Sequence, residues 1–289
     1  MVDIPDKDLL APGHRGCAGC GASIAVKLAL NALGENTVAI SATGCLEVMT
    51  TPYPESSWEV PFIHVAFENS GAVASGVESA LRIQGKDDVN VVAFGGDGGT
   101  VDIGLQSLSG AMERGHNMLY ICYDNEAYMN TGIQGSASTP KGGWSTTTPA
   151  GKLTHSKDLL RIAMAHDVPY AASASIANLT DMKRKVKKAR EVQGTAVLHI
   201  QCPCPTGWGY SSAKSIELCR EALQSGAWLL LEFEDGKLKI NQTPKKLGEI
   251  EGYTKLQKRF RGLSEEQMQN LKDSVIHRYN VLKAQENQG

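Results

Sequence analysis

The sequence predicts an α/β protein built on a parallel β-sheet, with a C-terminal extension. Three observations favour this fold class. Short apolar runs alternate with longer segments of helical periodicity, the runs are continuously apolar rather than apolar at every second residue, and glycines gather where the runs stop. Strands buried on both faces of a sheet, connected by helices, have this pattern. The 289 residues suffice for one large domain or two modest ones.

The expected elements follow one another in a regular order. Strands rich in Val, Ile and Phe, buried in the sheet, are expected at 37–42, 62–67, 89–94, 118–123, 170–174 and 196–201. Helices are expected at 22–33, 72–83, 105–114, 157–166 and 179–192, and Gly34 and Gly85 follow the first two as helix caps do. The polar stretch 124–153 lacks periodicity, and a loop of this length indicates a cover over a ligand or a partner.

The pattern changes after residue 225. Residues 228–240 read as two strands joined at Asp235 and Gly236, which predicts a β-hairpin. From residue 243 onward the chain is polar and helical in parts. We therefore expect a main domain over residues 1–225 and a hairpin-and-helix extension over residues 226–289.

Composition and charge exclude several classes of protein. The net charge of −2 gives no reason to expect a nucleic acid partner, and the basic run 183–190 is expected to be a solvated helix face. No apolar run approaches the roughly 20 residues that span a membrane, and the polar, acidic N-terminus is unlike a signal peptide. We therefore expect a cytoplasmic protein without a membrane partner. In that reducing compartment the seven cysteines are free thiols, metal ligands or catalytic groups.

A glycine-rich turn follows the expected strand 89–94. Gly96, Asp97, Gly98 and Gly99 lie where the backbone of a parallel sheet can approach a phosphate, at the carboxyl end of a strand. An aspartate there favours a divalent cation between the protein and the phosphate, and Asn125 offers an amide oxygen at the next strand end. An ordinary tight turn is the alternative. A dinucleotide site is less favoured, because the chain has no GxGxxG after its first strand.

The cysteines fall into two groups. Cys17 and Cys20 form a CxxC in a glycine-rich turn, Cys45 lies just past one strand end, and Cys202 and Cys204 flank a proline past another. Four of these five thiolates, with either Cys202 or Cys204 as the fourth, would gather at one edge of a sheet and suit either Zn²⁺ or a [4Fe–4S] cluster. Cys122 and Cys219 are expected to be core residues.

Five ordered motifs, CAGCG, TGC, GGDGG, YDNEAYMNTG and PCPTGW, resemble the β subunits of 2-oxoacid:ferredoxin oxidoreductases, most closely those that act on pyruvate. The resemblance covers essentially the whole chain. It implies a thiamin diphosphate-binding fold. It implies [4Fe–4S] ligation by Cys17, Cys20, Cys45 and Cys204, and Mg²⁺ ligation by Asp97, the Asn125 side chain and the Ala127 backbone oxygen. It also implies cofactor contacts from Gly44, Cys45, Gly96, Gly98, Gly99 and Tyr128, and a catalytic role for Asn130 facing the thiazolium and the substrate.

The same resemblance implies an activity and its partners. A 2-oxoacid would lose CO₂ with the help of thiamin diphosphate, and the acyl group would pass to coenzyme A. The electrons would leave through iron–sulfur clusters to ferredoxin. The reverse reaction would be the carboxylation of the acyl group. The glutamate that activates the cofactor and the arginine that binds the substrate belong to another chain in this family. We therefore expect α, γ and δ partner subunits and an isolated chain without activity.

Three alternatives stay open. The 2-oxoacid could be branched-chain, aryl or oxalate instead of pyruvate, because the recognising arginine lies elsewhere. A non-oxidative thiamin-dependent decarboxylase or lyase needs Asp97 and Asn125 but no set of four cysteines. A zinc-stabilised assembly subunit needs the cysteines but not the metal–diphosphate pair. The presence of both sets favours the oxidoreductase.

Overall fold

The computed structural model describes residues 8–288, so the first seven residues of the acidic N-terminal segment lie outside the described part of the chain. Its strands are β1 (Thr37–Ala42), β2 (Phe62–Val65), β3 (Asn90–Gly96), β4 (Leu119–Asp124), β5 (Tyr170–Ser175), β6 (Ala196–Gln201), β7 (Leu231–Glu234) and β8 (Lys237–Ile240). Its longer helices are α1 (Gly21–Leu33), α3 (Ser70–Ile83), α4 (Leu105–Arg114), α6 (Leu179–Glu191), α8 (Ser215–Ser225) and α10 (Glu265–Glu286). Short helices are α2 (Cys45–Thr50), α5 (Leu159–Met164), α7 (Pro205–Trp208) and α9 (Glu251–Lys255), with a π-helix at Gly98–Asp102 and 3₁₀ turns at Ser212–Lys214 and Lys258–Phe260.

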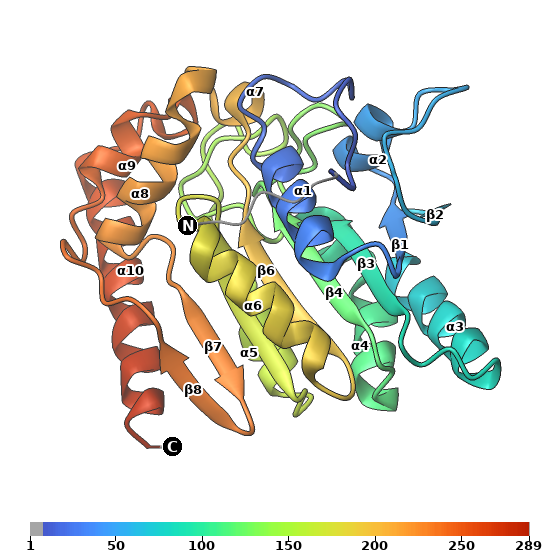
Figure 1. Cartoon of the computed structure of the whole chain (residues 1–289). Helices are drawn as coiled ribbons and strands as arrows, with labels where there is room; N and C mark the ends of the chain where they lie inside the picture. Colours follow the sequence, from blue (N-terminus) through green and yellow to red (C-terminus); the bar gives the residue numbers. More distant parts are fainter. Residues whose placement is uncertain (1–7, 289) are drawn as a thin grey trace.

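All eight strands form one sheet in the order β2-β1-β3-β4-β6-β5-β7-β8. The first six are parallel, as the sequence predicts, whereas β7 runs antiparallel to β5 and β8 antiparallel to β7. The expected hairpin is therefore present and continues the main sheet. Helices α1 and α6 cover one face, and α3, α4 and α5 cover the other (Figure 1).

The alternation of side chains along the central strands explains the two layers of core. In β3, Val92 and Phe94 belong to the core layer under α1 and α6, while Val91 and Ala93 belong to the layer under α3, α4 and α5. Both sets are buried because helices cover both faces, which accounts for the continuously apolar strand sequences. Among residues 8–288, no helix is both long and apolar enough to cross a membrane.

Two local expectations were wrong. The strand expected at 62–67 ends at Val65 and is half exposed instead of buried, because β2 is the edge of the sheet and has a neighbour on one side only. The basic run 183–190 is not a purely solvated face. The Lys185 ammonium is fully buried, donates to the Ser173 carbonyl oxygen at 2.7 Å and pairs with Asp181 at 2.8 Å.

The parallel strands place their carboxyl ends along one edge of the sheet, which is the upper edge in Figure 1. The N-terminal cysteine turn, α2, α7 and the long loop that follows β4 gather above this edge. The loop expected over 124–153 has no regular helix or strand after Asp124, and it extends to Asp158, because α5 begins at Leu159. Active sites of open parallel sheets lie at this edge, so the fold brings the motifs of the sequence to one place.

Candidate active site

A cavity of about 210 Å³ opens at the carboxyl ends of β1, β3 and β4. All ten residues that the sequence singles out for cofactor contact or catalysis line it: Gly44, Cys45, Gly96, Asp97, Gly98, Gly99, Asn125, Ala127, Tyr128 and Asn130. They come from three strand ends that are far apart in the chain and adjacent in the sheet. The structure thus brings these residues together, and their individual roles stay predictions.

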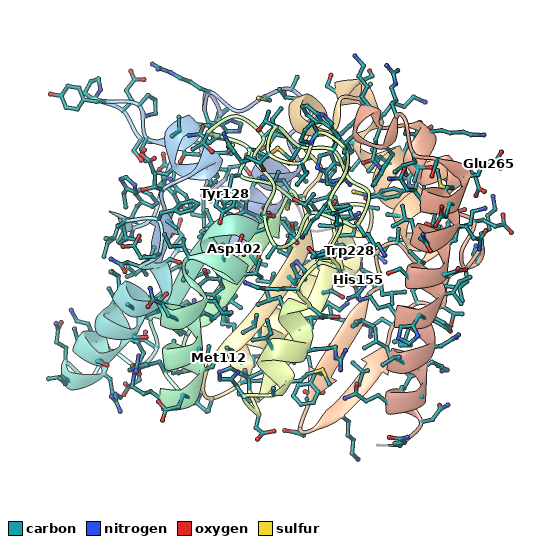
Figure 2. The ribbon with its side chains drawn as sticks, turned by 180° about the vertical axis from the view of Figure 1, so that it is seen from behind. Asp102, Met112, Tyr128, His155, Trp228 and Glu265 are labelled. Atoms are coloured by element: carbon teal, nitrogen blue, oxygen red, sulfur yellow. The ribbon has the colours of Figure 1, made fainter. Side chains whose placement is uncertain are left out.

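The glycine-rich turn forms the floor of this cavity. It passes from β3 directly into the π-helix, a rare form that is frequent at functional sites. A Cβ atom on Gly98 would lie only 2.3 Å from the ring of Tyr128, so no larger residue fits there. The Tyr128 hydroxyl donates to Asp102 at 2.9 Å, and Figure 2 shows the two side chains close together above α4. The long loop is therefore pinned onto the turn.

Three oxygen groups converge beside the turn. The side-chain oxygen of Asn125 faces the Asp97 carboxylate and the Ala127 carbonyl; with the amide turned over, its nitrogen would donate to them at 3.2 and 2.8 Å. A cation between the three oxygens satisfies the same geometry. Adjacent ligands of an octahedral Mg²⁺, at 2.0–2.1 Å from the ion, lie about 2.9 Å apart. Asp97, Asn125 and Ala127 fit a magnesium ion.

The electrostatics of Asp97 support the same interpretation. Its carboxylate is almost fully buried, and burial together with the neighbouring Asp124 raises its pKa well above the usual value. The Ser136 hydroxyl donates to it at 2.5 Å and opposes this rise. Asp124 itself pairs with His199 at 2.6 Å. A buried carboxylate without a full counter-charge is the environment in which a cation binds favourably.

The four expected cluster ligands meet at the same edge of the sheet. The CxxC turn packs on the segment after β6, since a Cβ on Gly19 would lie 2.3 Å from the Ser212 carbonyl oxygen, and Gly19 has the positive φ that glycine tolerates. The Ser215 hydroxyl also donates to the Gly19 carbonyl at 2.6 Å. Cys204 caps α7, and its sulfur accepts the Gly207 amide at 3.3 Å.

The four thiols influence one another's ionisation. Burial is the largest cause that raises the pKa of Cys45, and with the added effect of Cys204, Cys20 and Cys17 the pKa reaches about 12. Cys17 is exposed and Cys20, Cys45 and Cys204 are half-buried, whereas Cys202 is buried in the core. Cys122 and Cys219 are buried as well, as predicted. Within residues 8–288, no group of three or more His, Cys, Asp or Glu side chains is drawn together as tightly as one metal ion requires.

Several residues that shape the site were not foreseen. Thr43, Phe67, Tyr123, Met129 and Thr131 also line the cavity. All but Phe67 lie within motifs that the sequence does reveal, so membership of those motifs was the available signal. Ser136 lies within the featureless loop, and nothing in its neighbourhood marks it as the partner of Asp97.

Comparison with known proteins identifies the class first. The family model described as thiamine pyrophosphate enzyme, C-terminal TPP binding domain, matches residues 42–200, which is more than half of the chain. Pyruvate synthase subunit PorB of Methanothermobacter marburgensis is 59% identical over 279 residues, covering 95% of this chain and 97% of the relative. Ketoisovalerate oxidoreductase subunit VorB of Pyrococcus furiosus is 45% identical, covering 98% of this chain and 94% of the relative.

The chain therefore belongs to the β subunits of the 2-oxoacid:ferredoxin oxidoreductases, within the thiamine pyrophosphate enzymes. It is a 2-oxoacid oxidoreductase subunit, and the resemblance drawn from its motifs is confirmed. A solved structure agrees. The 2-oxoglutarate:ferredoxin oxidoreductase from Magnetococcus marinus, with 2-oxoglutarate, coenzyme A and succinyl-CoA bound, superposes with a TM-score of 0.61 at 26% identity over 76% of this chain and 81% of that one.

Proposed function

We propose that this chain is the catalytic β subunit of a coenzyme A-dependent pyruvate:ferredoxin oxidoreductase. It would hold thiamin diphosphate through Mg²⁺ on Asp97, Asn125 and Ala127. It would also hold a [4Fe–4S] cluster on Cys17, Cys20, Cys45 and Cys204. The observation that carries the proposal is the position of Cys45, which lines the cofactor cavity and is charge-coupled to the other three cysteines. A cluster on these cysteines would lie beside the cavity, where it could accept the electrons released there.

Different residues of the cavity would have different roles in cofactor binding and catalysis. When bound, thiamin diphosphate supplies the carbon nucleophile and the electron sink that decarboxylation needs. Asp97 and Asn125 would anchor its diphosphate through the metal, and the ring of Tyr128 covers Gly98 from above. Asn130 is exposed at the mouth of the cavity, where its amide can orient the substrate carboxylate or oxyanion.

The cavity also supports the expectation of partner subunits. Of the described residues that line it, Asp97 alone carries a carboxylate, and that group is turned to the metal site. The glutamate that thiamin enzymes use on the aminopyrimidine would then come from another chain. We infer an assembly with α, γ and δ subunits, using ferredoxin as acceptor and coenzyme A as co-substrate, in the cytoplasm.

Substrate identity is proposed from the relatives. PorB of Methanothermobacter marburgensis, named for pyruvate, is 59% identical to this chain, and VorB of Pyrococcus furiosus, named for ketoisovalerate, is 45% identical. Pyruvate is therefore the first candidate and a branched-chain 2-oxoacid the second.

The test uses the complete assembly, purified without oxygen. Coenzyme A-dependent reduction of ferredoxin is measured with pyruvate, ketoisovalerate and 2-oxoglutarate, and the chain alone is assayed in parallel. We expect the largest kcat/KM with pyruvate and no turnover by the chain alone. Release of an aldehyde without coenzyme A or acceptor would establish a non-oxidative decarboxylase instead, and turnover by the isolated chain would refute the shared active site.

A further inference from the structure

A buried arginine from the C-terminal part of the chain reaches the metal-binding loop. Arg259 lies in the 3₁₀ turn Lys258–Phe260 and is 4% exposed. Its guanidinium stacks on the indole ring of Trp208 at 3.6 Å and pairs with the Glu126 carboxylate at 2.5 Å. The remaining donors reach the Gln257 side chain at 2.5 Å and the Tyr253 hydroxyl at 2.9 Å. Each of the three guanidinium nitrogens therefore has a polar partner, and one face of the group is covered by the indole.

Both main partners of Arg259 act on the segment that carries the metal ligands. The Trp208 indole donates to the backbone oxygen of Asn125 at 2.7 Å. Glu126 lies between Asn125 and Ala127 and holds a φ of +61°, a left-handed conformation that is uncommon for residues other than glycine. That conformation turns the Asn125 amide and the Ala127 carbonyl toward the same point. Three contacts hold Glu126 in place: its amide donates to Asp124 at 2.7 Å, its carbonyl oxygen accepts from the Thr139 hydroxyl at 2.6 Å, and its carboxylate pairs with Arg259.

The arginine also touches the two other parts of the site. Trp208 ends α7, which begins after Cys204. The backbone oxygen of Arg259 accepts the Trp144 amide at 2.9 Å, so the same residue holds the long loop. The guanidinium therefore joins two segments, through Glu126 in the loop after β4 and Trp208 in α7, and the backbone of the same residue holds the third.

We propose that Arg259 is the positioning residue for the magnesium ligands. It holds the Glu126 carboxylate and the Trp208 ring, and through them it fixes the Asn125 and Ala127 oxygens in the orientation that the metal requires. The inference rests on the proposed function, since it needs a Mg²⁺–thiamin diphosphate complex at Asp97. Partners one step removed from a metal typically change its affinity by 10- to 100-fold when they are lost.

The test measures how much thiamin diphosphate the anaerobically purified assembly retains after gel filtration at increasing Mg²⁺ concentrations. The quantity compared between variants is the Mg²⁺ concentration that gives half of the maximal retention. Arg259→Met is expected to raise this concentration at least 10-fold, equivalent to about 1.4 kcal/mol. Arg259→Lys should not restore it, because an ammonium cannot stack and fork as a guanidinium does. Arg261→Met, two residues away and exposed, is the matched control and should match the wild type.

A second variant covers the case in which Arg259→Met fails to assemble. Trp208→Phe keeps a ring under the guanidinium and removes only the donor to the Asn125 oxygen. It should raise the half-saturating Mg²⁺ several-fold with unchanged iron content. Wild-type values for Arg259→Lys or Trp208→Phe, or an equal shift in Arg261→Met, would overturn the inference. If the wild-type assembly retained no cofactor at any Mg²⁺ concentration, the proposed function itself would fail.

Discussion

The choice of the fourth cluster ligand can be decided by a pair of substitutions two residues apart. Both cysteines are charge-coupled to Cys20, but Cys204 is half-buried and also coupled to Cys17, whereas Cys202 is 1% exposed within the apolar core. In the absence of iron, Cys45 is a protonated thiol at pH 7. Its pKa of about 12 means that forming the thiolate at pH 7 costs about 7 kcal/mol. Cluster binding must supply this energy through its iron–sulfur bonds.

Removal of one of the four cysteines removes a quarter of the bonds between protein sulfur and iron, whereas the free energy needed to ionise Cys45 is unchanged. We therefore expect Cys204→Ala to lower the iron content from about four atoms per chain to less than one. Cys202→Ala removes one buried sulfur and should cost about 1 kcal/mol of stability, as small core deletions do, with the iron retained.

The assay is iron and acid-labile sulfide analysis of the anaerobically purified assembly, with thermal unfolding as the control for folding. Retention of iron in Cys204→Ala together with its loss in Cys202→Ala would refute the assignment. One zinc and no sulfide in the wild type would refute the cluster altogether and would support a structural metal site.

Three further changes test other parts of the structure. Asn130→Ala should lower kcat about 100-fold with thiamin diphosphate content unchanged, as loss of one oxyanion donor does in other enzymes; an unaltered kcat would remove its catalytic role. Burial alone would raise the pKa of Glu232, but hydrogen bonds, chiefly from Arg184, lower it to about 2. This contributes about 3 kcal/mol of stability, which is present above the usual pKa of 4.5 and lost as the pH falls toward 2. Glu232→Gln should therefore lower the free energy of urea unfolding by about 3 kcal/mol at pH 7 and by less than half as much at pH 3, whereas equal losses would contradict the pKa. Tyr128→Phe removes the hydroxyl that donates to Asp102 and should cost about 1–2 kcal/mol, seen as faster hydrogen exchange in the long loop.

Much of the fold was predictable because the elements of a covered parallel sheet are encoded locally. The strands 37–42 and 196–201 and the helix 105–114 match the structure residue for residue. The convergence of Asp97 and Asn125 was predictable for a related reason. Both follow apolar strands, and the carboxyl ends of neighbouring parallel strands must lie at one edge.

What the sequence did not reveal depends on contacts between distant segments. Nothing in the strand 62–67 distinguishes an edge position from a central one, because the order of strands in the sheet is set by the whole chain. Lys185 reads like its basic neighbours, and only the packing of α6 on β5 buries it against the Ser173 carbonyl. Ser136 is one of many polar residues in a loop without periodicity.

The C-terminal part of the chain shows the same limit most clearly. Its hairpin and helices were predicted as an extension, yet β7 pairs with β5 and the turn at Lys258–Phe260 inserts Arg259 against Glu126 and Trp208. Removal of residues 226–289 would leave one edge of β5 unpaired and the Glu126 carboxylate buried without its counter-charge. Breaking a buried ion pair costs about 3–5 kcal/mol, because the remaining charge is uncompensated. The loop that carries Asn125 therefore depends on a segment that follows it by more than a hundred residues, so truncation to the apparent main domain should damage the metal site even where the six parallel strands still fold.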